Sequence, residues 1–234
     1  MEENFMEKLK EWEELLTKVI FENVPQVESL TPQEMVNYFL VGHRPKMIKS
    51  LELLDKYINS GDLAISVGSW ISAIGLFFYL KCGMKSESIS IDCNDWEVSG
   101  ITKNTRKNLC FVDSLGTEKY DLVIEAEMFS HYPCNILTVL KKMVDACKEN
   151  GIIHISVPLG NWGKFQGYPK DVNIKETSLD QTYHEHLRLF SKDEIVNIVK
   201  NNFSECQLLE NECVVTPLFG EIQITIWKKT HEKI

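Results

Sequence analysis

The stretch Leu63–Leu80, LAISVGSWISAIGLFFYL, contains no charged residue and decides how the fold is interpreted. An uncharged run of this length is long enough to raise the question of a membrane span. Four small residues interrupt it, Gly68, Ser69, Ser72 and Gly75, and no cluster of positive charge flanks it. We therefore predict a buried strand, a turn and a buried helix, and no contact with a membrane.

Downstream of this stretch, short apolar segments alternate with helical ones, as in α/β proteins. The expected strands are Leu63–Val67, Ser88–Asp92, Leu109–Val112, Asp121–Glu125 and Ile152–Val157. The clear helices between them are Ile74–Lys81 and Ile136–Lys148. Strands that are apolar on both faces are typical of a parallel sheet covered by helices on both sides.

The C-terminal part predicts one more helix and two closing strands. Ser191-Lys192-Asp193-Glu194 is a capping box, which opens a helix that runs to about Asn201. The strands Glu205–Leu209 and Glu221–Trp227 are joined by a short segment without a helix, so they should pair antiparallel. The predicted fold class is α/β: a parallel-core seven-stranded sheet with helices on both faces, a terminal antiparallel strand pair and an N-terminal helical extension.

Residues 1–60 predict helices instead of strands. Glu2–Glu22 has apolar residues at helical spacing. Thr31-Pro32-Gln33-Glu34 combines a capping threonine with a proline at the first helical position, so a helix should continue to about Leu40. A further helix is expected over roughly Pro45–Ile58. We expect two units: residues 1–60, which pack on the domain and cover the substrate, and residues 61–234, the α/β domain.

Composition narrows the function classes. The 234 residues carry a formal net charge of −9 and a sequence pI of about 5.2, whereas a nucleic-acid binder is expected to have a basic face. We therefore expect a small-molecule or protein substrate and no nucleic acid. None of the seven cysteines forms a Cys-x-x-Cys pair, so the sequence predicts no zinc site. Reduced thiols and an N-terminus without a secretory pattern predict a cytoplasmic protein.

The turn that follows the first strand, Gly68-Ser69-Trp70, is a candidate cofactor loop. Glycine lets the backbone approach a ligand closely, and a helix N-terminus then points its free N–H groups above the strand ends. The candidate binding residues are Ser66, Gly68 and Ser69. The alternative is an ordinary buried turn between strand and helix. In that turn the indole of Trp70 would either fill the ligand space or stack on the ligand.

Acidic and hydroxyl residues follow the next strands. Asp92 ends the second strand, where an acidic residue can accept hydrogen bonds from ribose hydroxyls, although it could also cap a turn. Asp113 and Ser114 follow the third expected strand, with a turn aspartate before Gly116 as the alternative. Glu125 ends the fourth strand. Together these four residues complete the candidate cofactor site.

Three longer blocks give the chain a family likeness. They are Tyr120–Pro133, YDLVIEAEMFSHYP; Lys148–Pro158, KENGIIHISVP; and Tyr183–Ser191, YHEHLRLFS. Their order of strand, acidic loop, helix, turn and strand ending in proline resembles the class I, Rossmann-like S-adenosylmethionine-dependent methyltransferases of the small-molecule type. The resemblance covers about residues 50–228 and makes residues 61–234 a methyltransferase-like domain.

The resemblance implies that S-adenosylmethionine is the cofactor and that Asp113 faces its adenine amino group. The glycine-rich loop of the family is degenerate in this chain. Ser66 stands where the family has an acidic residue, and Trp70 and Ser72 stand where it has glycines.

Three histidines and one carboxylate are the candidate catalytic residues. His131 follows the fourth strand, where a base could meet the methyl acceptor. His184 and His186 alternate as on a strand and should share one face. Glu127 is the candidate carboxylate that orients a base. The alternatives are a histidine that caps the loop for His131 and plain hydrogen-bonded histidines for the other two. No third ligand accompanies the pair, so we predict no metal.

The segment Pro158–Phe190 is too long for a simple connection and leaves the edge where open α/β sheets bind ligands. Its aromatic residues could exclude water from a reacting methyl group, so we interpret residues 158–190 as a lid or acceptor-site loop. The alternative is that these aromatics pack on a neighbouring subunit in a homo-oligomer.

The resulting hypothesis is an enzyme that transfers a methyl group from S-adenosylmethionine to a small polar acceptor. The displacement would be in line, and the main task of the protein would be to align donor and acceptor. The degenerate loop motivates an alternative, a catalytically silent methyltransferase-like scaffold or interaction protein. A nicotinamide dehydrogenase ranks third because the chain lacks the required glycine fingerprint.

Overall fold

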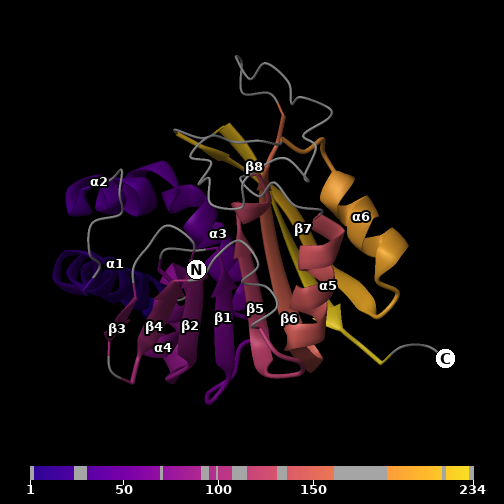
Figure 1. Ribbon diagram of the computed structural model, residues 1–234. Coiled ribbons are helices and arrows are strands. Elements are labelled where there is room, and N and C mark those ends of the chain that lie inside the picture. The colour runs from indigo at the N-terminus through magenta and orange to yellow at the C-terminus, as the bar shows by residue number, and fades with distance from the viewer. Residues whose placement is uncertain are drawn as a thin grey trace.

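The computed structural model describes residues 3–23, 31–68, 71–90, 95–98, 100–106, 115–130, 136–160, 189–217 and 220–231. Within these ranges the chain forms one mixed sheet flanked by helices (Figure 1). The N-terminal elements are α1 (Glu3–Asn23), α2 (Pro32–Asn37), the π-helix η1 (Tyr38–Gly42) and α3 (Arg44–Leu54). The later elements are β1 (Leu63–Val67), α4 (Ala73–Cys82), β2 (Lys85–Ser90), β3 (Trp96–Val98), β4 (Thr102–Arg106), β5 (Tyr120–Ala126), the short 3-10 helix η3 (Met128–Ser130), α5 (Ile136–Ala146), β6 (Cys147–Pro158), α6 (Glu194–Asn202), β7 (Cys206–Thr216) and β8 (Gly220–Lys229).

The strand order is β3-β4-β2-β1-β5-β6-β8-β7. The strands β4, β2, β1, β5 and β6 are parallel, while β8 runs antiparallel to both β6 and β7. This arrangement confirms the predicted parallel core and the terminal antiparallel pair. The described sheet has eight strands, of which six correspond to predicted strands; β3 and β4, which pair antiparallel with each other, were not predicted.

The parallel neighbour of β2 is Thr102–Arg106, TKNTR, a polar strand that the apolar pattern did not predict. The expected strand Leu109–Val112 lies outside the described residues. Strand β2 begins at Lys85, before the expected start at Ser88, and ends at Ser90. Strands near the edge of a sheet need fewer apolar residues than central ones, so hydrophobic periodicity detects them poorly.

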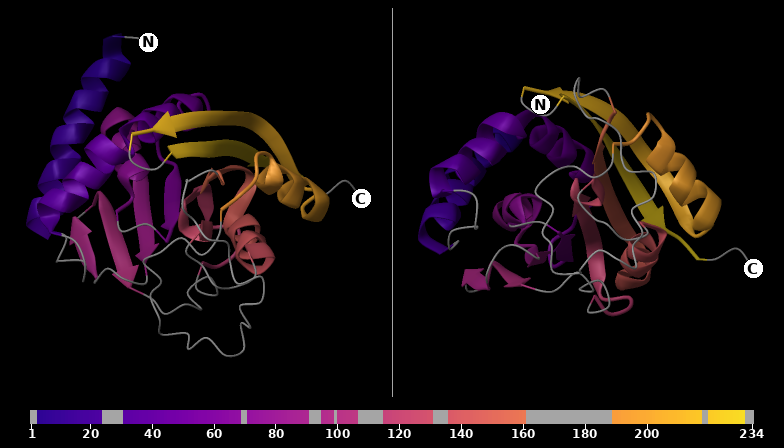
Figure 2. Two further views of the ribbon diagram at one scale, coloured as in Figure 1. Left: turned by 90° about the horizontal axis from the view of Figure 1, so that it is seen from above. Right: turned by 45° about the horizontal axis from the view of Figure 1, so that its top comes forward.

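Alternating side chains of the central strands divide the core into two layers. Ala64 and Leu122 pack with the helices α1 to α4, whereas Ile65 and Val123 pack with α5 and α6. This period of two is the expected geometry of a strand that is buried on both faces. Seen from above, the two groups of helices lie on opposite sides of the sheet (Figure 2).

The N-terminal helix α1 is part of the first of these layers. Trp12 is fully buried and its indole Nε1 donates a 2.7 Å hydrogen bond to the carbonyl oxygen of Ala73, at the start of α4. Phe5 of α1 also packs its ring against Phe77 of α4, with the ring centroids 5.2 Å apart. Residues 1–60 therefore contribute side chains to the same core as the sheet.

The capping predictions have two outcomes. At Thr31 the capping box is present, because Glu34 N donates to Thr31 Oγ1 and the Glu34 carboxylate accepts from the Thr31 backbone. At Ser191 the predicted box is wrong. Glu194 N donates to the Ser191 carbonyl oxygen and α6 begins after Asp193, whose backbone is left-handed at φ 63°. The Glu194 carboxylate still accepts a hydrogen bond from the Ser191 backbone N–H, which is one of the two hydrogen bonds of a capping box.

The uncharged stretch folds as the strand β1 and the helix α4. Among the helices of the described ranges, none combines the length and the apolar character that a membrane span requires.

Candidate functional site

The order of the strands places a topological switch point between β1 and β5. From β1 the chain moves to β2 on one side of the sheet and later returns to β5 on the other side. Open α/β sheets bind ligands at such a point, outside the carboxyl ends of the strands. Val67 is in register with Glu125 there. Gly68, at the end of β1, and Glu127, just after β5, therefore flank the switch point.

Gly68 fits the need for bare backbone at this edge. Its φ is +74°, and its N–H donates a 2.8 Å bond to the carbonyl oxygen of Ile89 on β2. A Cβ at this position would overlap the side chain of Met128, which packs directly on the glycine. Ser66 is buried, and its Oγ lies 2.8 Å from Ser72 Oγ. The Ser66 hydroxyl is thus bonded within the protein.

Glu125 is a buried carboxyl group held by backbone N–H groups. Phe129 N donates to its Oε1 at 2.9 Å, and Ser156 N donates to its Oε2 at 3.1 Å. Burial raises the pKa of Glu125 to about 8, with a further contribution from the neighbouring charge of Glu127. Glu125 is therefore predominantly protonated at neutral pH and ties the end of β5 to η3 and β6.

Glu127 is an ionised carboxylate that contacts Lys46 and His43 of the N-terminal segment. Lys46 Nζ donates to its Oε1 at 2.6 Å, and His43 Nδ1 lies 3.2 Å from the same oxygen. Burial alone would raise the pKa of Glu127, but Lys46 and His43 hold it well below its usual range. All three side chains are buried. The result is a buried charged cluster, Lys46–Glu127–His43, that joins α3 to the end of β5.

A second polar contact runs beside this cluster. Both ring nitrogens of His154 on β6 are hydrogen-bonded. Nε2 lies 2.9 Å from Ser50 Oγ, and Nδ1 lies 3.1 Å from the carbonyl oxygen of Glu125. Burial lowers the pKa of His154 to about 3, so its ring is neutral. The buried Ser156 Oγ has no hydrogen-bond partner among the described residues.

The structure places four of the sequence-predicted site residues at one edge of the sheet: Ser66, Gly68, Glu125 and Glu127. The other candidates lie outside the described residues: Ser69, Asp92, Asp113, Ser114, His131, His184 and His186. The segment 158–190 is likewise described only at its two ends. Sequence reasoning missed His43 and Lys46. The available signal was Lys46 and Ser50, two polar residues one helical turn apart beside the apolar stripe of Met47 and Leu51.

In the ranges that the structure covers, no group of three His, Cys, Asp or Glu side chains is placed to hold a metal. A polar organic molecule at these strand ends would lie near the backbone of Gly68. Such a ligand would share the edge with Met128, whose unbranched thioether side chain can adapt to it.

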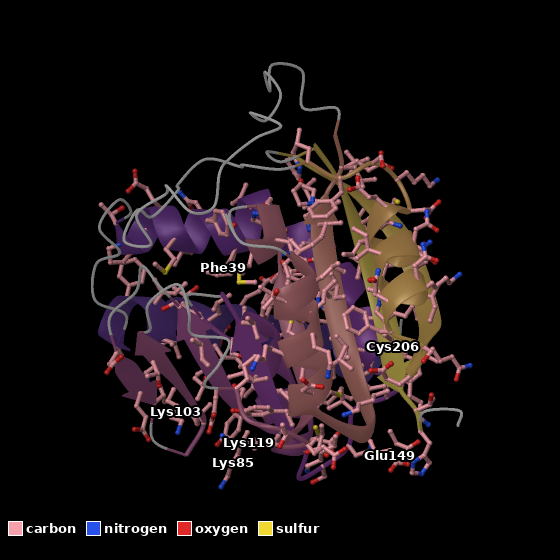
Figure 3. The ribbon with its side chains drawn as sticks, turned by 45° about the vertical axis from the view of Figure 1, so that its right-hand side comes forward. Phe39, Lys85, Lys103, Lys119, Glu149 and Cys206 are labelled. Atoms are coloured by element: carbon pink, nitrogen blue, oxygen red, sulfur yellow. The ribbon has the colours of Figure 1, made fainter. Side chains whose placement is uncertain are left out.

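The opposite ends of the strands, their amino ends, carry exposed ion pairs. Figure 3 shows Lys85, Lys103 and Lys119 at the amino ends of the strands, away from Phe39 of η1. Lys103 and Lys119 pair with Glu87 at 3.3 and 3.1 Å, and both lysines are about half exposed. Exposed ion pairs of this kind contribute little to stability. They also lie at the amino ends of the strands, whereas open α/β sheets bind ligands at the carboxyl ends.

The raised pKa of Glu125 predicts an alkaline loss of stability. Above pH 4.5 the unfolded state loses a proton that the folded state keeps up to about pH 8, so the free energy of unfolding falls as pH rises. His154 acts in the opposite direction only below pH 6.5. Urea unfolding should therefore show a decline of about 1–2 kcal/mol between pH 6.5 and 8, since one pKa unit corresponds to about 1.4 kcal/mol.

The variant Glu125→Gln keeps the size of the side chain and removes its titration, so it should flatten this decline. The exposed Glu14→Gln should retain it. A decline of equal size in Glu125→Gln would assign the effect to other groups.

The comparisons with known proteins identify the fold. No family model and no curated protein sequence matches the chain. Among solved structures it is similar to the 1,6-didemethyltoxoflavin-N1-methyltransferase of Burkholderia thailandensis with bound 1,6-didemethyltoxoflavin and S-adenosylhomocysteine. The TM-score is 0.55 at 13% identity, over 89% of this chain and 96% of the other.

Two further solved structures show how widely the fold is used. A SAM-dependent methyltransferase from Archaeoglobus fulgidus has a TM-score of 0.51 at 14% identity, over 82% of this chain and 99% of its own. The cyclase SpnF has a TM-score of 0.55 at 8% identity, over 95% and 94%. The strand order and these likenesses agree, and the chain has the fold of the class I S-adenosylmethionine-dependent methyltransferases.

Proposed function

We propose that the protein transfers a methyl group from S-adenosylmethionine to a small polar acceptor. The observation that carries this proposal is the topological switch point between β1 and β5, which Gly68 and Glu127 flank at the carboxyl ends of the strands. S-Adenosylmethionine supplies an electrophilic methyl group when bound. The task of the protein is then to hold donor and acceptor in line and to keep water away from them.

The donor would be held by residues at the carboxyl ends of the strands. In this proposal Gly68 and Ser69 approach it with their backbone, Asp92 accepts hydrogen bonds from the ribose, and Asp113 with Ser114 faces the adenine. Ser66 and Glu125 stabilise the strand ends beneath the donor, because both are bonded within the protein. His131, His184 and His186 stay candidate bases, and the segment 158–190 the candidate acceptor side.

The domain arrangement and the location are parts of the same proposal. Residues 1–60 would cover the site that residues 61–234 form, which the contact of Lys46 with Glu127 supports. The described cysteines are free thiols, and Cys147 and Cys206 are buried, which supports a reducing, cytoplasmic environment.

Removing the ribose-binding carboxylate should weaken donor binding. We expect Asp92→Ala to reduce the affinity for S-adenosylhomocysteine by about 1–3 kcal/mol, the usual cost of losing a charged hydrogen-bonding partner. Isothermal titration calorimetry measures this directly, with the exposed Asp95→Ala as the control that keeps wild-type affinity. Equal affinity in Asp92→Ala would remove Asp92 from the site.

Met128 favours a second candidate, a methyltransferase-like scaffold without a cofactor. Its side chain packs on Gly68 at the place where bare backbone would otherwise meet a ligand. The same titration separates the two candidates. If the wild type binds neither S-adenosylmethionine nor S-adenosylhomocysteine at millimolar concentration, the scaffold is the correct function. If Met128→Ala then gains binding, Met128 is the group that closes the site.

A further inference from the structure

The side chain of Met128 fills the space beside Gly68 at the carboxyl end of β1. A Cβ built on Gly68 would lie 2.5 Å from Met128 Sδ and 2.6 Å from Met128 Cβ, far inside van der Waals contact. Met128 is only 7% exposed and belongs to the core layer on the side of α5 and α6. In this structure a ligand therefore cannot touch that side of the Gly68 backbone.

Rotation of the Met128 side chain does not clear this space. The thioether is unbranched and can turn away from Gly68. The Cβ atom cannot follow, because it is fixed to the backbone, and it also stands too close to the glycine to admit a ligand atom. Opening the space therefore requires the backbone of η3, Met128–Ser130, to move away from β1.

A strained residue precedes η3 directly. Glu127 has φ +67°, in the left-handed region that residues with a Cβ adopt only at a cost in free energy. Residues of this kind persist where the surrounding structure fixes them, and they are frequent in switch regions. A return of Glu127 to an ordinary φ would redirect the next residue, Met128. Glu127 is therefore placed to act as a hinge for η3.

Buried contacts hold η3 in its present position. Glu127 N donates to the Ser156 carbonyl oxygen at 2.9 Å, and Lys46 Nζ donates to Glu127 Oε1 at 2.6 Å. Within η3, Phe129 N donates to Glu125 Oε1 at 2.9 Å. Because Lys46 belongs to α3, the N-terminal helical segment takes part in fixing the hinge.

We propose that η3 is a gate, closed in this structure, that controls the access of S-adenosylmethionine to Gly68, a role that rests on the proposed methyl transfer. In the closed state Met128 fills the place of the donor beside Gly68. In the open state Glu127 leaves the left-handed region and η3 carries Met128 away from β1. Lys46 favours the closed state because its bond fixes Glu127 in the present conformation. The N-terminal helices thereby influence how readily the donor enters.

Isothermal titration calorimetry with S-adenosylhomocysteine tests the gate in the full chain. Met128→Ala removes the thioether and weakens the closed state. It should bind about tenfold or more tightly than the wild type, because apparent affinity rises with the fraction of open molecules. Met128→Leu is the matched control, since it keeps the bulk of the side chain and should bind no more tightly than the wild type. A Met128→Ala variant that is folded by circular dichroism and gains no affinity over a wild type that binds would overturn the proposal.

Oxidation of methionines by hydrogen peroxide, read by mass spectrometry, tests the gate without a nucleoside. Met143 is fully buried and Met6 is 47% exposed, so both serve as references within the same chain. Lys46→Leu removes the bond that fixes Glu127 and adds no sulfur. It should speed the oxidation of Met128 about tenfold or more relative to Met143, since a local opening exposes the gate and leaves the core closed.

The two experiments separate the gate from the proposed function. Equal acceleration of Met128 and Met143 in Lys46→Leu indicates global unfolding and contradicts the gate. If the wild type and both Met128 variants fail to bind the nucleoside at millimolar concentration, the proposed methyl transfer fails. Selective oxidation of Met128 in that case still supports a gate, one that serves another ligand.

Discussion

Lys46→Met should lower the free energy of unfolding by about 3–5 kcal/mol, the usual cost of breaking a buried ion pair from one side. Lys46 and Glu127 are both buried, and Nζ lies 2.6 Å from Oε1. Methionine fills most of the volume, so the loss comes mainly from a carboxylate that stays buried with fewer partners. Urea unfolding at pH 7 measures the change.

Two variants identify the source of this loss. Lys46→Met combined with Glu127→Gln removes both charges, and it should recover much of the stability because no uncompensated charge is left. Lys18→Met removes a lysine that is 66% exposed and should change stability by less than about 0.5 kcal/mol. If the double variant is no more stable than Lys46→Met, the loss reflects packing and the charge argument is wrong.

Trp12→Ala should cost about 3–5 kcal/mol, as truncations of large buried aromatic side chains do. The indole of Trp12 is fully buried between α1 and the sheet-facing helix α4, and its Nε1 donates to Ala73. The substitution leaves a cavity and an unsatisfied carbonyl group in the same place. Thermal unfolding monitored by circular dichroism and urea unfolding should agree on the loss.

The same helix offers a matched control. Phe21 of α1 is 53% exposed, so Phe21→Ala should change stability by less than about 0.5 kcal/mol. Trp12→Phe separates the two contributions, since it keeps much of the ring and removes the donor. Equal effects of Trp12→Ala and Phe21→Ala would show that α1 is a dispensable arm.

The sequence determined the central part of the fold in detail. Strand β1 was predicted as Leu63–Val67 and has these bounds, because a strand buried on both faces must be apolar throughout. Strand β4, Thr102–Arg106, was missed because its residues are polar and its neighbour β3 is only a short edge strand. Hydrophobic periodicity detects burial and misses strands that are held mainly by backbone pairing.

The candidate site was predictable only where its residues follow a strand. Glu125 and Glu127 were found because an acidic loop after the fourth strand is a local pattern. Lys46 and His43 were missed because they precede Glu127 by about eighty positions in a segment that predicts helices. Local spacing shows that Lys46 shares a helix with apolar residues, but only the packed fold brings it to a carboxylate. The π-helix Tyr38–Gly42, which ends at His43, has no signature in the sequence.

The position of β8 between β6 and β7 has a consequence for synthesis. A ribosome makes Cys206–Thr216 before Gly220–Lys229, yet β7 has β8 as its neighbour in the described sheet. Until β8 emerges, the outer edge of β6 and the whole of β7 expose unpaired backbone groups, which are sites of edge-to-edge aggregation. Completion of the sheet is therefore a late, post-emergence event. A nascent chain stalled after Thr216 should depend on chaperones more strongly than a chain in which β8, up to Lys229, has emerged from the ribosome.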